Sequence, residues 1–298
     1  MKQVAVMTDS NSGLTPEQAA DMGVFVLPMP IIVDGHTYYE NVDITPAEFY
    51  AKQRQGLSTT TSQPSPELLL SMWDTLLQDY AEVVYIPMSS QLSNSYQSAL
   101  LFSAQYDGRV QVVDNVRISV TQWMAVQDAR LLAERGLDAR QIKAVLEGEA
   151  HDATIYICVD TLTYLKKSGR VTPAAAAIGT ALQIKPVLTI QGGKLDSYTK
   201  ARSRKAAFRA MIKALRNDLH TRLRKLDEKG RLVLGMASTW MPAEEIHAWL
   251  SRFQAEFPRR EIVYGPLTLS IGCHTGAGAF GIGAVRRHTA DEELPEKC

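Results

Sequence analysis

Short apolar segments that end in hydroxyl-rich loops constrain this chain more than any other feature of its sequence. Val4–Met7 leads into Thr8-Asp9-Ser10, and Val83–Ile86 leads, after Pro87, into the serine-rich stretch 89–95. A helical pattern follows each loop, and this order of strand, loop and helix is typical of a parallel sheet. Ligands bind at the carboxyl ends of such strands, where helix N-termini direct N–H groups toward anions. The sequence therefore predicts an α/β fold that binds a small anion or an anionic head group.

The first half of the chain is predicted to be one α/β domain, residues 1–159. Its strand candidates are Val4–Met7, Val83–Ile86, Val110–Val113 and Ile155–Val159. Two helix starts are marked by Thr15-Pro16 and Thr45-Pro46, because threonine is a favoured N-cap and proline suits the first helical position. A small hairpin near residues 31–44, centred on Asp34-Gly35, interrupts this alternation of strands and helices.

The second half, residues 160–298, is predicted to be a mixed α/β domain. Residues 188–198 have the pattern of a hairpin with Gly192-Gly193 at its turn. One long amphipathic helix is expected next, because apolar residues recur at intervals of three and four from Phe208 to Leu226. Strands are expected at 232–236, 262–264 and 280–285.

Composition excludes several classes of function. Among 298 residues, 32 are Lys or Arg and 32 are Asp or Glu, so no net charge attracts nucleic acid. Nowhere do eighteen apolar residues run together, and the N-terminus has no apolar signal region, so we expect a cytoplasmic protein with no integral membrane association. The three cysteines fit neither a disulfide framework nor a metal site, and we expect no metal.

The remaining motifs each allow more than one interpretation. Gly276-Ala-Gly278-Ala-Phe-Gly281 matches a dinucleotide fingerprint but lies too near the chain end for the helix and strand that this fold needs. It is either a plain turn or a turn that approaches an anion beside His274. Ser93 is either an ordinary helix N-cap, a ligand-binding hydroxyl, or the nucleophile of a lipid hydrolase with His274 as base. Arg170 and Arg202 are either solvated charges or contacts for a phosphate or an acidic partner.

Motifs spread over nearly the whole chain resemble those of the DegV family, in the same order. They lie at residues 8–10, 39–44, 61–66, 92–99, 161–170, 184–186, 200–202 and 272–276. The resemblance implies a Rossmann-like, parallel-sheet N-terminal domain. It also implies a C-terminal mixed α/β domain that resembles part of dihydroxyacetone kinase, with a fatty acid held between the two domains.

The resemblance also implies a function in phospholipid metabolism. Proteins of this kind bind a long-chain fatty acid and present its carboxylate to a separate, dihydroxyacetone-kinase-like ATP-binding subunit, which forms an acyl phosphate. The chain is then a lipid-binding subunit, not an enzyme by itself, and needs no cofactor. The residues implied to bind the carboxylate are Thr61, Ser62, Ser93, Asn94, His274 and Thr275. Arg170 and Arg202 are implied to contact the kinase or the phosphate.

Three positions depart from the small residues that the family has there, namely Gln91, Thr121 and Trp123. Trp123 either lines the acyl pocket and shortens it, or packs into the core of the N-terminal domain. Ala175 and Ile178 belong to a run of small and apolar residues that is either a helix-packing surface or a wall along the acyl chain. A lipid sensor that signals through a protein surface is an alternative to the kinase subunit.

Overall fold

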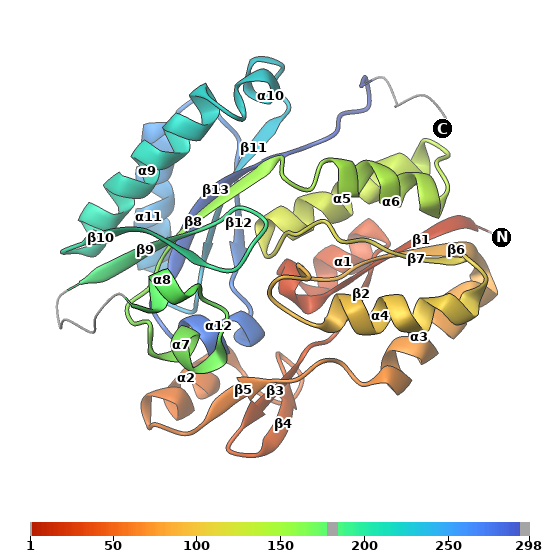
Figure 1. Cartoon of the computed structure of the whole chain (residues 1–298), viewed down its shortest axis with the longest axis horizontal. Helices are drawn as coiled ribbons and strands as arrows, with labels where there is room; N and C mark the ends of the chain where they lie inside the picture. The colour runs from red at the N-terminus through yellow and green to blue at the C-terminus, as the bar shows by residue number, and fades with distance from the viewer. Residues whose placement is uncertain (1, 178–183, 293–298) are drawn as a thin grey trace.

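The computed structural model describes residues 2–177 and 184–292 of the chain. These residues form a four-stranded sheet, a six-stranded sheet and a small three-stranded sheet, with helices packed on them (Figure 1). The two larger sheets lie on either side of the helix α5 (Val120–Glu134), which touches strands of both. The described residues include no helix that is long and apolar enough to span a membrane.

The four-stranded sheet is entirely parallel, as the sequence predicts, and its strand order is β2-β1-β6-β7. Its strands are β1 (Lys2–Asp9), β2 (Phe25–Leu27), β6 (Tyr80–Ile86) and β7 (Val110–Val112). The helices α3 (Pro66–Asp79) and α4 (Ser95–Ser103) share a hydrophobic core with one face, in which Trp73 is fully buried. The helices α5 and α6 (Ala139–Gly148) share a core with Val6, Val84 and Ile86 on the other face.

The predicted helix starts are confirmed at both threonines. The helix α1 (Pro16–Met22) begins with a capping box, in which the Thr15 hydroxyl accepts from the Gln18 N–H and the Gln18 side chain accepts from the Thr15 N–H. The helix α2 (Pro46–Arg54) begins in the same way with Thr45 and Glu48. Each box satisfies two N–H groups that the first turn of a helix leaves unpaired.

The six-stranded sheet has the order β10-β9-β8-β13-β11-β12 and is mostly antiparallel. Its strands are β8 (Ala153–Cys158), β9 (Lys185–Ile190), β10 (Asp196–Ala201), β11 (Leu232–Ser238), β12 (Ile262–Pro266) and β13 (Phe280–Arg286). The prediction that Ile155–Val159 lies in the first sheet is therefore wrong, because β8 pairs with β9 and β13. A buried apolar run indicates a strand but does not reveal its partners.

The predicted long helix is also divided in two. The helix α9 (Arg204–His220) ends where Thr221 leaves the helical region, with φ −119° and ψ −98°, and α10 (Arg224–Glu228) follows. The helices α9 and α11 (Ala243–Glu256) cover one face of the six-stranded sheet, where Phe208, Trp249 and Phe253 are buried.

The hairpin predicted near residues 31–44 is confirmed as β3 (Pro30–Val33) and β4 (His36–Tyr39). These two strands form a small sheet with β5 (Thr59–Thr61). This sheet packs on α12 (Leu269–Thr275), which comes from the far end of the chain. Gly272 lets Tyr50 of α2 pack against α12, because a Cβ at this position would lie 2.2 Å from the Tyr50 hydroxyl. The shorter helical segments are η1 (Ser10–Ser12), η2 (Ala104–Tyr106), α7 (Thr163–Ser168) and α8 (Pro173–Ala176).

The start of α5 fixes this helix to the six-stranded sheet. A Cβ on Gly235 of β11 or on Gly265 of β12 would lie 2.9 Å or 3.0 Å from methyl groups of Val120. Because these two glycines have no side chain, Val120 packs directly against the sheet backbone. Further along, α5 lies in a core that contains Val84 of the first sheet and Val233 of the second.

Candidate functional site

The loops after β1, β5 and β6 meet α12 around a polar chamber of about 260 Å³. Each of these loops follows the carboxyl end of a strand, which is where the sequence places the anion site. Its lining includes all six side chains that were implied to bind a carboxylate, namely Thr61, Ser62, Ser93, Asn94, His274 and Thr275. The structure therefore brings together residues that are more than 200 positions apart in the sequence.

A hydrogen bond joins two residues of this set that are far apart in the sequence. The Thr61 hydroxyl lies 3.0 Å from Nε2 of His274. Burial and, to a lesser extent, the positive charge of Arg170 lower the pKa of His274 to about 4. The imidazole is therefore neutral near pH 7, and it offers one donor and one acceptor instead of a full positive charge.

Ser93 lies at the turn into α4. Its hydroxyl lies 2.8 Å from the Ser95 hydroxyl and accepts a hydrogen bond from the Ser95 N–H. Asn94 occupies the N-cap position without a capping side-chain bond. The N-cap is therefore Asn94 and not Ser93, while Ser93 lines the chamber and its role in ligand binding stays a prediction.

The hydrolase interpretation lacks its base in this arrangement. A nucleophilic serine needs an imidazole within hydrogen-bond reach. Over the described residues, the Ser93 hydroxyl pairs with Ser95 and Nε2 of His274 pairs with Thr61, so no hydrogen bond joins Ser93 to His274.

A buried polar network connects the loops that line the chamber, and the sequence did not reveal its role. Asp9 is fully buried and accepts four hydrogen bonds, from the N–H and the side chain of Asn11, the Met88 N–H and the Gln122 amide. Burial raises the pKa of Asp9, and these donors oppose the rise. Asn11 in turn accepts from the Ser270 hydroxyl of α12. The network joins loops from both halves of the chain, and Asn11, Met88 and Ser270 line the chamber.

The two arginines do not lie together. Arg170 is half-buried in the chamber wall, where its Nε donates to the Leu92 carbonyl at 3.4 Å. It also lines a polar groove of about 290 Å³, which shares Ser93 and Asn94 with the chamber and adds Lys194. Arg202 is exposed and lines neither space. Its neighbour Arg204 is paired with Asp160 and Glu245.

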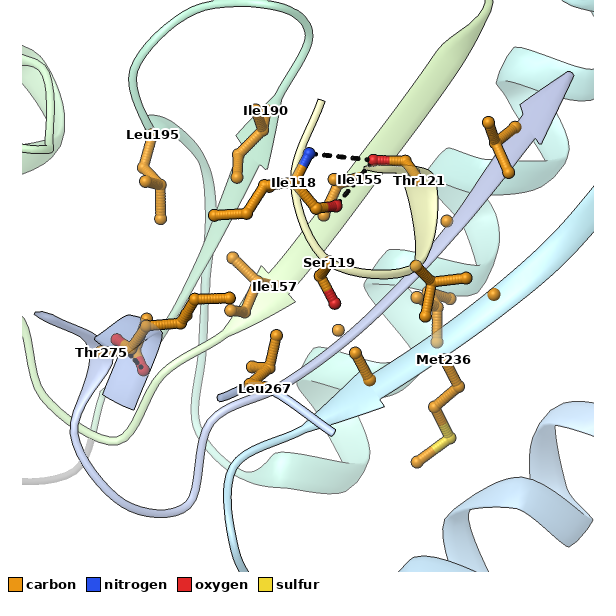
Figure 2. A pocket seen from close by; sticks show the side chains of 18 of the residues that line it. Ile118, Ser119, Thr121, Ile155, Ile157, Ile190, Leu195, Met236, Leu267 and Thr275 are labelled. Carbon is orange, nitrogen blue, oxygen red and sulfur yellow. Dashed lines mark hydrogen bonds between the residues drawn. The ribbon is translucent and has the colours of Figure 1, made fainter. Parts of the chain in front are cut away.

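An apolar chamber of about 70 Å³ adjoins the polar one (Figure 2). Isoleucines of β8 and β9 form one side, and the glycine-rich strands β11 and β13 form another. The residues that line both chambers are Leu92, Ile118, Leu195, Ile271 and Thr275. The two chambers together form one cavity, of which one part is lined by polar side chains and the other by apolar side chains.

Comparison with known proteins identifies the family. The DegV family model matches residues 3–287. The chain belongs to the DegV family. A DegV domain-containing protein of Listeria monocytogenes is 31% identical over 289 residues, which cover 94% of this chain and 98% of that protein.

Solved structures of DegV proteins share this fold. The structure of a DegV family protein from Thermus thermophilus, described as fatty-acid binding, has a TM-score of 0.83 and 31% identity, and the match covers 95% of this chain and 99% of that one. DegV from Bacillus subtilis, described as a fatty acid binding protein, has a TM-score of 0.82 and 25% identity, with coverage of 96% and 100%. The mixed α/β fold expected of a DegV protein is thus confirmed, while the likeness to dihydroxyacetone kinase stays a prediction.

The three residues proposed to line the acyl pocket of this DegV protein lie elsewhere or outside the described residues. Trp123 packs in the core around α5 and is absent from the lining of both chambers, so the second of its two interpretations holds. Ala175 is fully buried in a cluster with Leu165 and Val171, and it lines neither chamber. Ile178 lies outside the described residues. Of the departures from the family pattern, Thr121 lines the apolar chamber and Gln91 lines the outer groove.

The glycine-rich turn between α12 and β13 is explained by packing. Gly276 and Gly278 have φ of 74° and 77°. A Cβ on Gly276 would lie 2.7 Å from the Tyr164 ring, and one on Gly278 would lie 2.6 Å from the Asp160 carboxylate. This turn of the DegV protein follows a helix and not a strand, and neither glycine lines either chamber, while its approach to an anion beside His274 stays a prediction. No group of side chains suited to a metal ion occurs in residues 2–177 and 184–292.

Proposed function

We propose that this protein binds a long-chain fatty acid, with the carboxylate in the polar chamber and the tail in the apolar chamber. The observation that most supports this is that an apolar chamber adjoins one lined by hydroxyls and a neutral imidazole. Relatives of the same fold, from Thermus thermophilus and Bacillus subtilis, are described as fatty-acid binding.

The two ends of the ligand contribute differently to binding. Each methylene removed from water stabilises the complex by about 0.8 kcal/mol, so the tail supplies most of the affinity. The apolar chamber of about 70 Å³ is smaller than a long acyl tail, so such a tail has to widen it. The carboxylate is held by the hydroxyls of Thr61 and Ser93, which bind it without forming a tight ion pair.

In the same proposal, the bound carboxylate is presented to a separate ATP-dependent kinase subunit that forms an acyl phosphate. The outer groove supports this, because it shares Ser93, Asn94 and Arg170 with the polar chamber and adds Lys194. Two cationic side chains beside the carboxylate suit the charge of a phosphoryl group in transfer. The protein then acts in the cytoplasm and is not catalytic alone.

Lipid analysis tests the binding step. Mass spectrometry after denaturing extraction should find about one fatty acid per purified wild-type chain. The double variant Thr61→Ala, Ser93→Ala should lose most of it, because each hydrogen bond to a charged group is worth about 1.5–3 kcal/mol. The matched control is Ser103→Ala, which removes a hydroxyl that donates to the Leu100 carbonyl outside both chambers. Full lipid occupancy in the double variant would refute the carboxylate site.

A second assay tests the kinase step. Purified protein loaded with fatty acid is mixed with ATP and a dihydroxyacetone-kinase-like subunit, and acyl phosphate is trapped with hydroxylamine. Product should form only when both proteins are present. Absence of product with such subunits, while lipid still binds, would reject the kinase role and leave the binding role standing.

A further inference from the structure

One hydroxyl in the apolar chamber has no hydrogen-bond partner among the described residues. Ser119 lines this chamber and is only 6% exposed, and its hydroxyl forms no hydrogen bond with any described residue. Figure 2 shows its side chain pointing into the chamber between Ile157 and Leu267. Buried hydroxyls are nearly always hydrogen-bonded, so this one calls for an explanation.

The other hydroxyls of the chamber are satisfied. Thr121 donates to the Ile118 carbonyl at 2.8 Å and accepts from the Ile118 N–H. Thr275 donates to the Ile271 carbonyl at 3.2 Å. Among the described residues that line either chamber, Ser119 carries the one buried side-chain oxygen without a partner.

Local structure does not account for a hydroxyl at this position. Ser119 is the N-cap residue of α5, yet its side chain accepts no hydrogen bond from the helix. Its φ of 56° and ψ of −138° lie in a region that favours glycine. Its N–H donates to the Asn11 carbonyl at 2.9 Å, a contact that glycine makes equally well. Neither helix capping nor the backbone conformation requires serine.

The start of α5 adds donors beside this hydroxyl. Val120 and Thr121, the first two residues of this fifteen-residue helix, line the same chamber. The first N–H groups of a helix have no partner within the helix, and they carry a partial positive charge. An oxygen atom is thus the group that best fits this part of an otherwise apolar wall.

We propose that Ser119 binds an oxygen substituent on the acyl tail, so that the protein selects hydroxy or keto fatty acids over plain ones. This inference rests on the proposed fatty-acid binding and names the class of fatty acid. A serine hydroxyl both donates and accepts, so it matches either substituent. A plain tail expels water from the chamber and leaves the hydroxyl unpaired.

The substituent belongs in the tail and not beside the carboxylate. Ile118 lines both chambers, whereas Ser119 lines only the apolar one. A hydroxyl on the carbon next to the carboxylate stays in the polar chamber and does not reach Ser119. A mid-chain hydroxyl is therefore the matching position.

Calorimetric titration of delipidated protein with two ligands of equal length tests this. The ligands are stearate and a mid-chain hydroxystearate. Wild type should bind the hydroxystearate about 10-fold more tightly, the size expected when a buried hydroxyl gains its partner. Ser119→Ala should bring the ratio close to one, while Ser103→Ala, which removes a hydroxyl bonded within α4, should keep the wild-type ratio.

A second variant separates ligand selection from folding. Ser119→Gly relieves the positive φ, so it should melt no lower than wild type and still lose the preference. A wild-type ratio near one, as expected if water satisfies Ser119, or an unchanged ratio in Ser119→Ala, would overturn this proposal. Failure of wild type to bind either ligand would instead refute fatty-acid binding itself.

Discussion

The polar chamber and the apolar chamber adjoin, yet the chain builds them in different ways. Loops and helix ends from both halves of the chain form the polar chamber, and a buried network around Asp9 holds them. Side chains of the six-stranded sheet, such as Ile155 and Ile157, form much of the apolar chamber. In the proposed complex, recognition of the head group thus depends on a few hydroxyls, whereas recognition of the tail depends on the shape of a sheet face. A change in one chamber should leave the other intact.

The largest effect should come from filling the apolar chamber. Ala237 of β11 lines this chamber and not the polar one, and Ala237→Phe should occupy the space of the tail. Excluding about four methylenes costs roughly 3 kcal/mol, so fatty-acid affinity should fall by about 100-fold in calorimetric titration. Ala237→Ser is the matched control and should bind nearly as wild type does. Wild-type affinity in a folded Ala237→Phe protein would show that the tail lies elsewhere.

A smaller effect, on stability, should arise beside the polar chamber. Glu40 accepts a hydrogen bond at 2.8 Å from the Leu269 N–H of α12, the helix that carries His274. Burial raises the pKa of Glu40 to about 7, although this bond opposes the rise. The folded protein therefore holds the proton more tightly than the unfolded chain, and the free energy of unfolding should fall as pH rises from about 5 to about 7.

Glu40→Gln tests this, because glutamine keeps the acceptor and cannot ionise. The variant should lose about 2 kcal/mol of the pH dependence, measured by urea unfolding at several pH values. Glu17→Gln, at an exposed position of α1, should retain the wild-type dependence. If Glu40→Gln and wild type change equally with pH, the carboxyl of Glu40 is not the group responsible.

The smallest effects should separate the two arginines. Arg170→Ala removes a cation from the chamber wall and should weaken fatty-acid binding several-fold, corresponding to about 1 kcal/mol. Arg202 is exposed and lines neither chamber, so Arg202→Ala should change affinity by less than about two-fold. Titration of both variants with the same fatty acid compares them directly. Equal losses would mean that Arg202 reaches the ligand.

The sequence predicted the polar chamber better than the apolar one, for a physical reason. Hydroxyl residues such as Thr61 and Ser93, in segments at the ends of strands, are unusual in a packed core, so they indicate a binding site. An isoleucine that faces a cavity has the same pattern as one that faces a helix, so Ile155 and Ile157 gave no signal. The unpaired hydroxyl of Ser119 also depends on which groups surround it, and sequence spacing does not reveal that.

The same limit applies to the fold. Helix caps and hairpins depend on residues that are close in the sequence. The helix caps at Thr15 and Thr45 and the hairpin of β3 and β4 were therefore predicted correctly. The sheet to which β8 belongs depends on partners more than 100 residues away in β13. The break after His220 has neither glycine nor proline to mark it, and the apolar spacing continues through Leu223.

The position of α5 makes the two halves of the molecule one folding unit. Its side chains lie in one hydrophobic core that includes residues of both large sheets, and Val120 packs against the backbone of Gly235 and Gly265. A fragment that keeps only one sheet would expose one apolar side of this helix to water, at a cost comparable to the stability of a small domain. The halves are therefore expected to melt in a single transition, and a protease cut between them would yield pieces that aggregate instead of functioning separately.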